Sequence, residues 1–408
     1  MRILFFSQTL PSSGSRPGTR HSGAWIDALV RSIKNQPAVT VAVAFLSKDR
    51  HEPYCEEGVF FYPLHQKNTL LARVDRFWNF TKTDAAIVEA CECVIADFKP
   101  DVIQVFGIAE SSFGLLCGRT KIPVAIHIQG LLAPCLNAWV PPFYTLWNYT
   151  VANGKTVKSI VLTWRAWKYN QHLARRERHV LRSCRYLLGR THWDKAYSRL
   201  YAPQSTYFHC GEMLRDIFYT ASERKTEAPV TFVSTLSNPL YKGHDLILKT
   251  ANALKETGVA DFTWKVYGVT QMSMAERKTC IRAADVNVRC MGVATPEQIK
   301  DALLSCTAYV HPSYIDNSPN SVGEAQMVGA PVVATNVGGV SSMVQHDDTG
   351  FLVPANDPFA MASTLLRLVH DPMLRDRISE NAKQCAIRRH DRHAIVDGLL
   401  ETYRTIFS

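Results

Sequence analysis

Residues 313–340, SYIDNSPNSVGEAQMVGAPVVATNVGGV, carry the densest pattern of helix and turn signals in this chain of 408 residues. Ser318 is a good N-cap and Pro319 a good first helical residue, so a helix is predicted to begin there. Gly329, before an Ala-Pro pair, is a suitable stop for that helix. An apolar segment then reads as a buried strand that ends at a Gly-Gly pair.

Two carboxylates lie eight residues apart in this pattern, Asp316 in the loop and Glu324 in the predicted helix. The first backbone N–H groups of a helix have no partner within it, so those of Asn320 and Ser321 would favour a phosphate. Gly323 weakens the helix, which makes sense if another group approaches the backbone closely. The pattern therefore fits either a site for an anionic, hydroxyl-rich ligand or a surface helix with a solvated Glu324.

On both sides of this stretch, short apolar segments alternate with helical patterns, which predicts parallel sheets with crossover helices. The predicted strands are residues 2–6, 39–46, 101–107, 122–130 and 185–189, then 229–236, 262–268, 286–292, 308–313 and 331–335. The predicted helices include residues 23–33, 84–98 and 244–256, and the chain is helical from about residue 356. Because the pattern restarts after the polar segment 211–229, we expect two doubly wound α/β domains.

The composition limits the kinds of partner and the classes of protein that need to be considered. A formal charge of +10 favours nucleic acid, an acidic membrane or an anionic substrate as partner. Eleven cysteines without a paired framework indicate reduced thiols and a cytosolic protein, and no zinc-ligand spacing is present. No segment approaches the roughly twenty apolar residues of a membrane helix. No G-x-G-x-x-G follows a strand and no G-x-x-x-x-G-K-[ST] occurs, so dinucleotide dehydrogenases and P-loop NTPases fit poorly.

Three segments, residues 211–218, 233–249 and 292–353, together resemble the family 4 glycosyltransferases. The motifs that carry the resemblance are Lys-Gly, the paired acids, G-A-P-V-V-A-T, Gly-Gly and T-G-F-L-V. The resemblance implies the α/β GT-B architecture, two Rossmann-like doubly wound parallel-sheet domains that face each other across a cleft. Residues 1–217 would bind the acceptor, with the C-terminal helix, about 392–408, packed back on them. Residues 218–391 would bind a nucleotide sugar, and neither a metal nor another cofactor is expected.

The resemblance also implies roles for single residues in the second domain. Glu324 matches the acid that holds the donor ribose, and Asp316 matches the acid, usually Glu, that touches the donor sugar. Lys242 matches the lysine that grips the diphosphate, where a compact cation suits a departing phosphate. The arginine that normally precedes it is missing, because Ser234 and Thr235 stand there. Donor binding would then also involve Thr235 and the helix start, with Ser318, Asn320 and Ser321.

In the first domain, Gly23 matches the glycine that brings the backbone near the donor phosphate, and Arg20, in the same basic loop, is a candidate acceptor contact. Gln129 stands where the family often has His-Gly and is assigned a catalytic role near the donor sugar. His127, two residues earlier, is either a structural strand residue or an acceptor contact. Arg190 follows a predicted strand and would meet an acidic or phosphorylated acceptor.

Residues 138–171 mix aromatic residues with lysine and arginine. Such a segment fits core packing, stacking on sugars, a membrane surface or nucleic acid. We expect a retaining glycosyltransferase that moves a sugar from a nucleotide-diphosphate donor to a hydroxyl of a glycan or lipid-linked acceptor. Its role would be bacterial cell-surface polysaccharide synthesis, in the cytoplasm or at the inner face of an anionic membrane, without nucleic acid. A non-catalytic nucleotide-sugar-binding partner subunit and a sugar-nucleotide epimerase are the alternatives.

Overall fold

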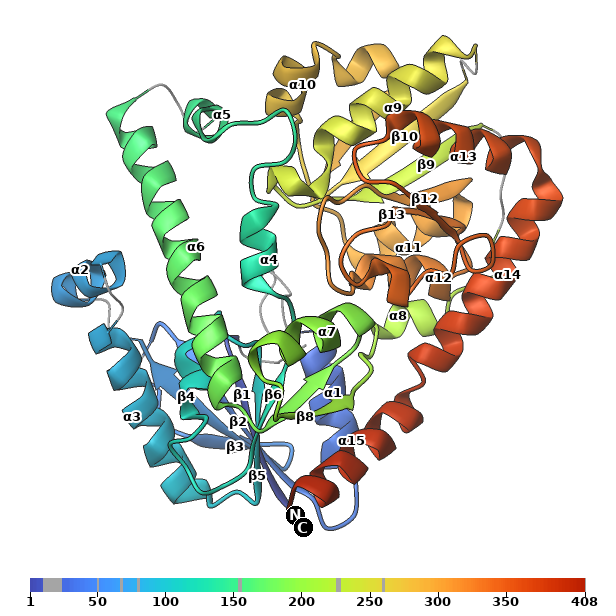
Figure 1. Cartoon of the computed structure of the whole chain (residues 1–408). Coiled ribbons are helices and arrows are strands. Elements are labelled where there is room, and N and C mark those ends of the chain that lie inside the picture. Colours follow the sequence, from blue (N-terminus) through green and yellow to red (C-terminus); the bar gives the residue numbers. More distant parts are fainter. Residues whose placement is uncertain are drawn as a thin grey trace. The chain divides into compact units, whose positions relative to one another are not determined.

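The computed structural model describes residues 1–9, 24–49, 51–66, 69–78, 81–152, 156–224, 229–258 and 261–407. The chain divides into two compact units (Figure 1). Unit 1 consists of Met1–Ala133, Arg165–Met213 and Asp391–Ser408, and unit 2 of Pro134–Trp164 and Leu214–His390.

Residues 134–164 cluster with unit 2, whereas the predicted boundaries place them in the first domain. One reason is that Phe143 packs against a side chain of unit 2, with Lys249 Nζ 4.1 Å from the centre of its ring. The C-terminal helix, α15 (Arg392–Phe407), belongs to unit 1 and contacts helix α1 (Ala24–Lys34), as the resemblance implied.

The sheet of unit 1 has the strand order β3-β4-β2-β1-β5-β6-β7-β8, and every pairing is parallel except the one between β3 and β4. Its strands are β1 (Arg2–Ser7), β2 (Thr40–Ser47), β3 (Tyr54–Glu56), β4 (Val59–His65), β5 (Val102–Phe106), β6 (Val124–His127), β7 (Tyr186–Gly189) and β8 (Thr206–His209). The five strands predicted for this half are confirmed. The sequence did not predict the two edge strands, β3 and β8, or β4, which pairs with β3.

Unit 1 buries both faces of its sheet, as expected for parallel strands covered by helices. In β1, Ile3 and Phe5 pack with α1 and α15 on one face. Leu4 and Phe6 alternate with them and pack with helix α3 on the other. The other helices of this half are α2 (Leu70–Trp78), α3 (Thr81–Phe98), η1 (Ser112–Leu116) and α7 (His192–Tyr201). Helix α6 (Val157–Ser183) is divided, because its residues up to Trp164 cluster with unit 2 and the rest belong to unit 1.

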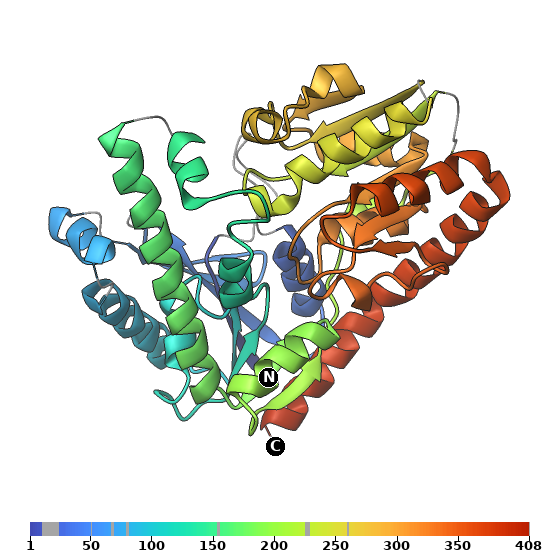
Figure 2. The same ribbon diagram turned by 45° about the horizontal axis from the view of Figure 1, so that its top comes forward.

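Unit 2 holds an all-parallel sheet of order β11-β10-β9-β12-β13-β14. Its strands are β9 (Val230–Thr235), β10 (Phe262–Tyr267), β11 (Val288–Gly292), β12 (Ala308–His311), β13 (Val332–Thr335) and β14 (Phe351–Val353). Its helices are α5 (Leu146–Ala152), α8 (Asp216–Tyr219), η2 (Leu240–Lys242), α9 (His244–Glu256), α10 (Ser273–Thr279), η3 (Ala283–Val286), α11 (Pro296–Ser305), α12 (Asn320–Met327), η4 (Val340–Ser342), α13 (Pro358–His370) and α14 (Pro372–Arg389), and α4 (Leu132–Asn137) begins just before it. Helices α9 and α13 lie side by side on one face (Figures 1 and 2).

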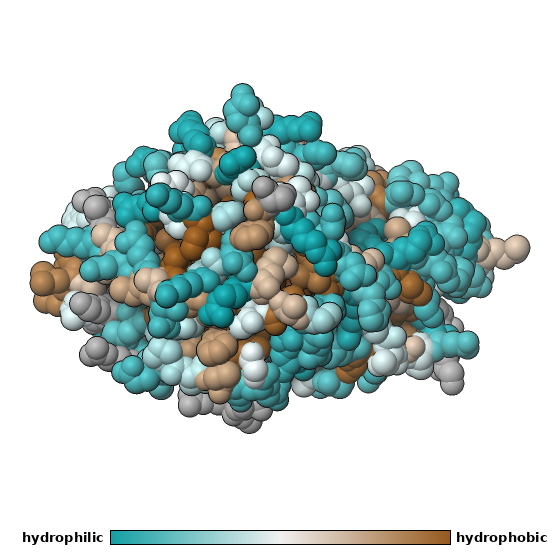
Figure 3. Space-filling view, turned by 90° about the horizontal axis from the view of Figure 1, so that it is seen from below, coloured by the Kyte–Doolittle hydropathy of each residue, from teal (hydrophilic) through white to brown (hydrophobic). Residues whose placement is uncertain are grey.

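The face of the molecule drawn in Figure 3 is mostly hydrophilic, and its apolar residues stand in separate groups between polar ones. This distribution agrees with the large buried cores of both units. Within the ranges that the structure describes, no helix has both the length and the apolar character needed to cross a membrane.

Candidate functional site

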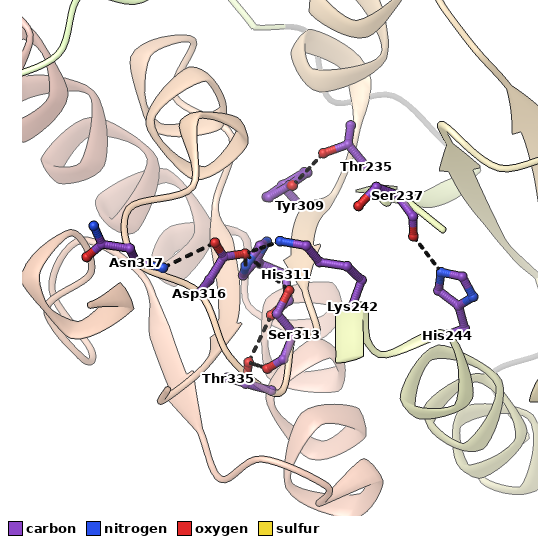
Figure 4. A network of polar contacts seen from close by, with 10 residues as sticks. All are labelled: Thr235, Ser237, Lys242, His244, Tyr309, His311, Ser313, Asp316, Asn317 and Thr335. Atoms are coloured by element: carbon purple, nitrogen blue, oxygen red, sulfur yellow. Dashed lines mark hydrogen bonds and ion pairs between the residues drawn. The ribbon is translucent and has the colours of Figure 1, made fainter. Parts of the chain in front are cut away.

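The strongest candidate site lies in unit 2, beyond the carboxyl ends of the neighbouring strands β9 and β12. In open parallel sheets, ligands bind beyond the carboxyl ends of the strands. Lys242 ends the short helix η2 after β9, and Asp316 lies in the loop after β12. The Lys242 Nζ atom is 2.6 Å from Asp316 Oδ2 (Figure 4), so the structure brings these two predicted residues together.

The carboxylate of Asp316 has several further partners. His311 Nε2 lies 3.1 Å from Oδ2, Ser313 Oγ donates to Oδ2 at 3.4 Å, and the Asn317 backbone N–H donates to Oδ1 at 3.2 Å. Burial alone would raise the pKa of Asp316, but Lys242 and the hydrogen bond from His311 outweigh burial and lower it. Asp316 is therefore ionised at neutral pH.

Two glycines explain why the Lys-Gly and Gly-Gly motifs accompany these residues. Gly243 has φ +84°, and a Cβ atom there would lie 2.0 Å from the carbonyl oxygen of Pro312. Gly338 has φ +54°, and its Cβ atom would lie 2.0 Å from the carbonyl oxygen of Asp316, which accepts a hydrogen bond from Gly339 N–H at 3.0 Å. Only glycine combines this conformation with such close approach. The motifs therefore hold the loops that carry the ion pair.

Glu324 lies in α12 and its side chain is only 8% exposed. Both carboxylate oxygens accept from Arg215, Oε1 from Nε at 2.7 Å and Oε2 from Nη2 at 2.8 Å. Burial raises the pKa of Glu324, and Arg215 opposes that rise. Glu324 is thus not a solvated helix residue, and the alternative of a surface helix is wrong. Arg215 belongs to the 211–218 motif but was not among the residues predicted for the site.

The start of α12 differs in one detail from the prediction. The N-cap is Pro319 rather than Ser318, and the helix begins at Asn320 without a side-chain cap. Ser321 and Thr235 both contact the hydroxyl of the buried Tyr309, with Thr235 Oγ1 2.8 Å from it (Figure 4). The predicted donor residues on β9 and α12 are therefore linked through one tyrosine.

Gly323 was expected to admit a close neighbour, and that neighbour is part of the protein. A Cβ atom at Gly323 would lie 2.9 Å from His390 Nε2 and 3.3 Å from Leu214 Cδ2. The helix ends at Met327, and Gly329 follows with φ +77°, as a helix stop requires.

In unit 1, Arg190 and Gln129 come together. The Arg190 Nη2 group donates to the Gln129 carbonyl oxygen at 2.8 Å, and its Nη1 atom pairs with the buried carboxylate of Glu212. The Arg190 side chain is 8% exposed. Its charge is thus already compensated within the protein, which favours a structural role over the predicted contact with an acidic acceptor.

His127 ends β6 and is fully buried. Tyr403 donates to Gln104 Oε1, and Gln104 Nε2 lies 3.2 Å from His127 Nδ1. Since the amide group donates, Nδ1 is the acceptor and Nε2 carries the hydrogen. Burial and the nearby Arg190 hold the pKa of His127 well below its usual value. His127 is therefore neutral, with its hydrogen on Nε2. Gly23 and Arg20 lie outside the described residues.

Comparison with known proteins agrees with this geometry. The family model for glycosyl transferases group 1 matches residues 217–385. The D-inositol 3-phosphate glycosyltransferase of Salinispora arenicola is 33% identical over 184 residues, which are 43% of this chain and 40% of that protein. The amylovoran biosynthesis glycosyltransferase AmsK of Erwinia amylovora is 28% identical over 148 residues, 34% of this chain and 36% of that protein. The matches thus span well under half the length of these curated relatives.

Solved structures extend the likeness to the whole fold. Sucrose-phosphate synthase from Thermosynechococcus elongatus has a TM-score of 0.73 at 15% identity and covers 100% of this chain and 99% of its own. Anabaena HepE in complex with UDP-glucose has a TM-score of 0.62 at 15% identity and covers 99% of each chain. The fold is therefore GT-B. Residues 217–385 match the family model of the group 1 glycosyl transferases, in agreement with the resemblance of the motifs.

Proposed function

We propose that the protein is a retaining glycosyltransferase that moves a sugar from a nucleotide-diphosphate donor to a hydroxyl of a glycan or lipid-linked acceptor. The observation that supports this most strongly is the Lys242–Asp316 ion pair at the carboxyl ends of β9 and β12, in a group 1 glycosyltransferase unit. The nearby helix α12 carries a second buried carboxylate, Glu324.

In this proposal, Lys242 neutralises the diphosphate as it departs, and the start of α12 adds backbone N–H groups that favour phosphate. Glu324 accepts hydrogen bonds from the ribose hydroxyls, and Asp316 accepts one from the donor sugar. Since Lys242 supplies positive charge at the leaving group, we propose that catalysis needs no metal. HepE, a neighbour in fold, has been solved with UDP and with UDP-glucose, which supports a nucleotide-sugar donor.

Further assignments belong to the same proposal. Unit 1 would bind the acceptor, with Gln129 acting near the donor sugar. The cellular role would be polysaccharide synthesis, at the cytoplasmic face of a membrane or in the cytoplasm.

A thermal-shift screen against UDP, GDP and ADP sugars tests the proposal directly. We expect one nucleotide to raise the Tm of the wild type, and this shift to shrink in Lys242→Ala and Glu324→Ala. Lys278→Ala is the matched control, because Lys278 is an exposed lysine elsewhere in unit 2. If no nucleotide raises the Tm of the wild type, the proposal is wrong.

Product analysis with the nucleotide sugar found in the screen tests the chemistry. We expect transfer in the presence of EDTA and, by NMR, a product with the anomeric configuration of the donor. Conversion of the donor sugar without an acceptor would indicate an epimerase instead. Nucleotide binding without either reaction would indicate a partner subunit.

A further inference from the structure

The amino-terminal half of α6 exposes large apolar side chains in a regular stripe. Val157, Ile160, Val161 and Trp164 follow the i, i+3, i+4, i+7 spacing of one helix face. They are 77%, 49%, 45% and 43% exposed, respectively. This spacing normally marks the face of a helix that packs on a protein core. In α6 the stripe faces outward instead.

The inward face of the same helix segment shows the matching feature, since polar residues are buried there. Ser159 and Thr163 are 1% and 3% exposed, so hydroxyl-bearing residues occupy the positions where a globular helix has its aliphatic ones. Further along the helix the usual arrangement returns, with Leu173 and Ala174 buried. Among the described residues, packing within the chain thus buries the second half of α6 but leaves Val157, Ile160 and Val161 of the first half exposed.

The charge of the surrounding sequence is equally one-sided. Residues 111–176 contain eight Lys or Arg residues and no Asp or Glu. The whole chain has 36 acidic residues in 408, so a segment of this length would ordinarily hold about six. Lys158, Arg165 and Lys168 of α6 are exposed beside the apolar stripe. The helix thus presents aliphatic and aromatic side chains together with positive charge only.

We propose that this surface, Val157–Lys168 of α6, binds an anionic lipid bilayer, with the apolar stripe in the acyl boundary and the basic residues at the headgroups. Apolar burial and attraction to anionic headgroups act together in such interfacial helices. A second copy of this chain is a poorer partner, because two surfaces of the same positive sign repel each other. Nucleic acid would neutralise the charge but would leave the aliphatic stripe exposed.

Helix α2 of unit 1 carries the same kind of face. Leu70, Leu71, Val74 and Trp78 share one side of the helix and are 76%, 80%, 48% and 65% exposed. A second amphipathic helix with an exposed apolar face supports the same kind of partner. The proposal deepens the membrane location proposed above, and it does not depend on which donor sugar is used.

Flotation of the full chain with lipid vesicles tests the proposal. We expect binding to vesicles of phosphatidylcholine with phosphatidylglycerol, weaker binding at higher salt, and none to phosphatidylcholine alone. Ile160→Ser with Val161→Ser should weaken binding at least tenfold. Lys158→Gln with Lys168→Gln should weaken it about 30-fold, at about 1 kcal/mol for each charge near the surface.

Matched controls make the result specific to α6. Val293→Ser with Met373→Ser removes two exposed apolar side chains of unit 2, and Arg277→Gln with Lys278→Gln removes two exposed charges there. These controls should bind within about twofold of the wild type.

Three results would overturn the proposal. They are no flotation of the wild type at low salt, α6 variants that bind as tightly as the wild type, or a wild-type dimer in light scattering that Ile160→Ser with Val161→Ser turns into monomer. The nucleotide-induced Tm shift of the α6 variants separates this proposal from the proposed function. We expect that shift to remain at its wild-type value.

Discussion

Replacement of Arg215 by Met removes the only cation that contacts Glu324 among the described residues. Loss of one partner from a buried ion pair costs about 3–5 kcal/mol, because the other charge stays buried. The Arg215 side chain is 31% exposed, so water can enter beside Glu324 and the cost should fall to about 2–3 kcal/mol. For a unit of this size, that is a fall in Tm of about 4–12 °C.

The pH dependence of this loss identifies its cause. Burial already raises the pKa of Glu324 in the folded protein, and the loss of Arg215 raises it further. When the pKa of a carboxyl group is higher in the folded than in the unfolded protein, the group does not lower the free energy of unfolding below the unfolded-state pKa, about 4.3 for Glu. It lowers that free energy as the pH rises from there through the folded-state pKa. The difference in unfolding free energy between wild type and Arg215→Met should therefore be small near about pH 4 and complete near about pH 8.

Urea unfolding across this pH range measures the difference, with Arg277→Met as a control for the loss of an exposed arginine of unit 2. The double variant Arg215→Met with Glu324→Gln should recover most of the stability at about pH 8, since the neutral amide leaves no charge to bury. A loss no greater than that of the control, or one that does not change with pH, would refute the reasoning.

Three further outcomes are expected. In urea unfolding, Gly243→Ala should lower the free energy of unfolding by about 3 kcal/mol or more, because its backbone is left-handed and the new Cβ atom clashes with Pro312. Gly258 is also left-handed but has open space around it, so Gly258→Ala should lower it by only about 1–2 kcal/mol. The pKa of Asp316 is lowered, so its stabilisation is present above about pH 3.9 and is lost as the pH falls through the folded pKa. The stability deficit of Asp316→Asn should accordingly shrink in acid. Asp316→Asn also frees Lys242, so UDP should bind several-fold more tightly by calorimetry while sugar transfer slows. Equal or weaker UDP binding would contradict the competition between Asp316 and the diphosphate.

Much of the fold follows from apolar periodicity, because most strands are continuous buried segments. The helix predicted for residues 244–256 has those bounds in the structure. The missed strands β3 and β8 are short, and none of their residues is buried, so no buried apolar run marks them. The N-cap at α12 was misplaced by one residue because both Ser318 and Pro319 are good helix-start residues.

The candidate site was predictable only where its residues belong to the motifs that resemble the family. That resemblance pointed to Lys242, Asp316 and Glu324, and the structure joins the first two directly. Partners that come from distant segments left no local pattern. Arg215 is 109 residues from Glu324, and Tyr403 reaches Gln104 across 299 residues. Such pairs depend on how the strands and helices are assembled, which no single stretch of sequence specifies.

The proposed donor-binding acids and cations are already paired with one another, and this bears on selectivity. A ligand that offered only phosphate to Lys242 would leave Asp316 without its cation. The free-energy cost of the unpaired carboxylate would cancel part of the binding free energy that the phosphate gains from Lys242. A nucleotide sugar offers a diphosphate to the lysine and hydroxyl donors to the carboxylates, so it replaces both partners of an opened pair. The paired charges compensate each other within the protein. Binding of free phosphate is therefore disfavoured, because it would break that pairing without replacing it. In the proposed function, selectivity for a nucleotide sugar would thus follow from the exchange of partners.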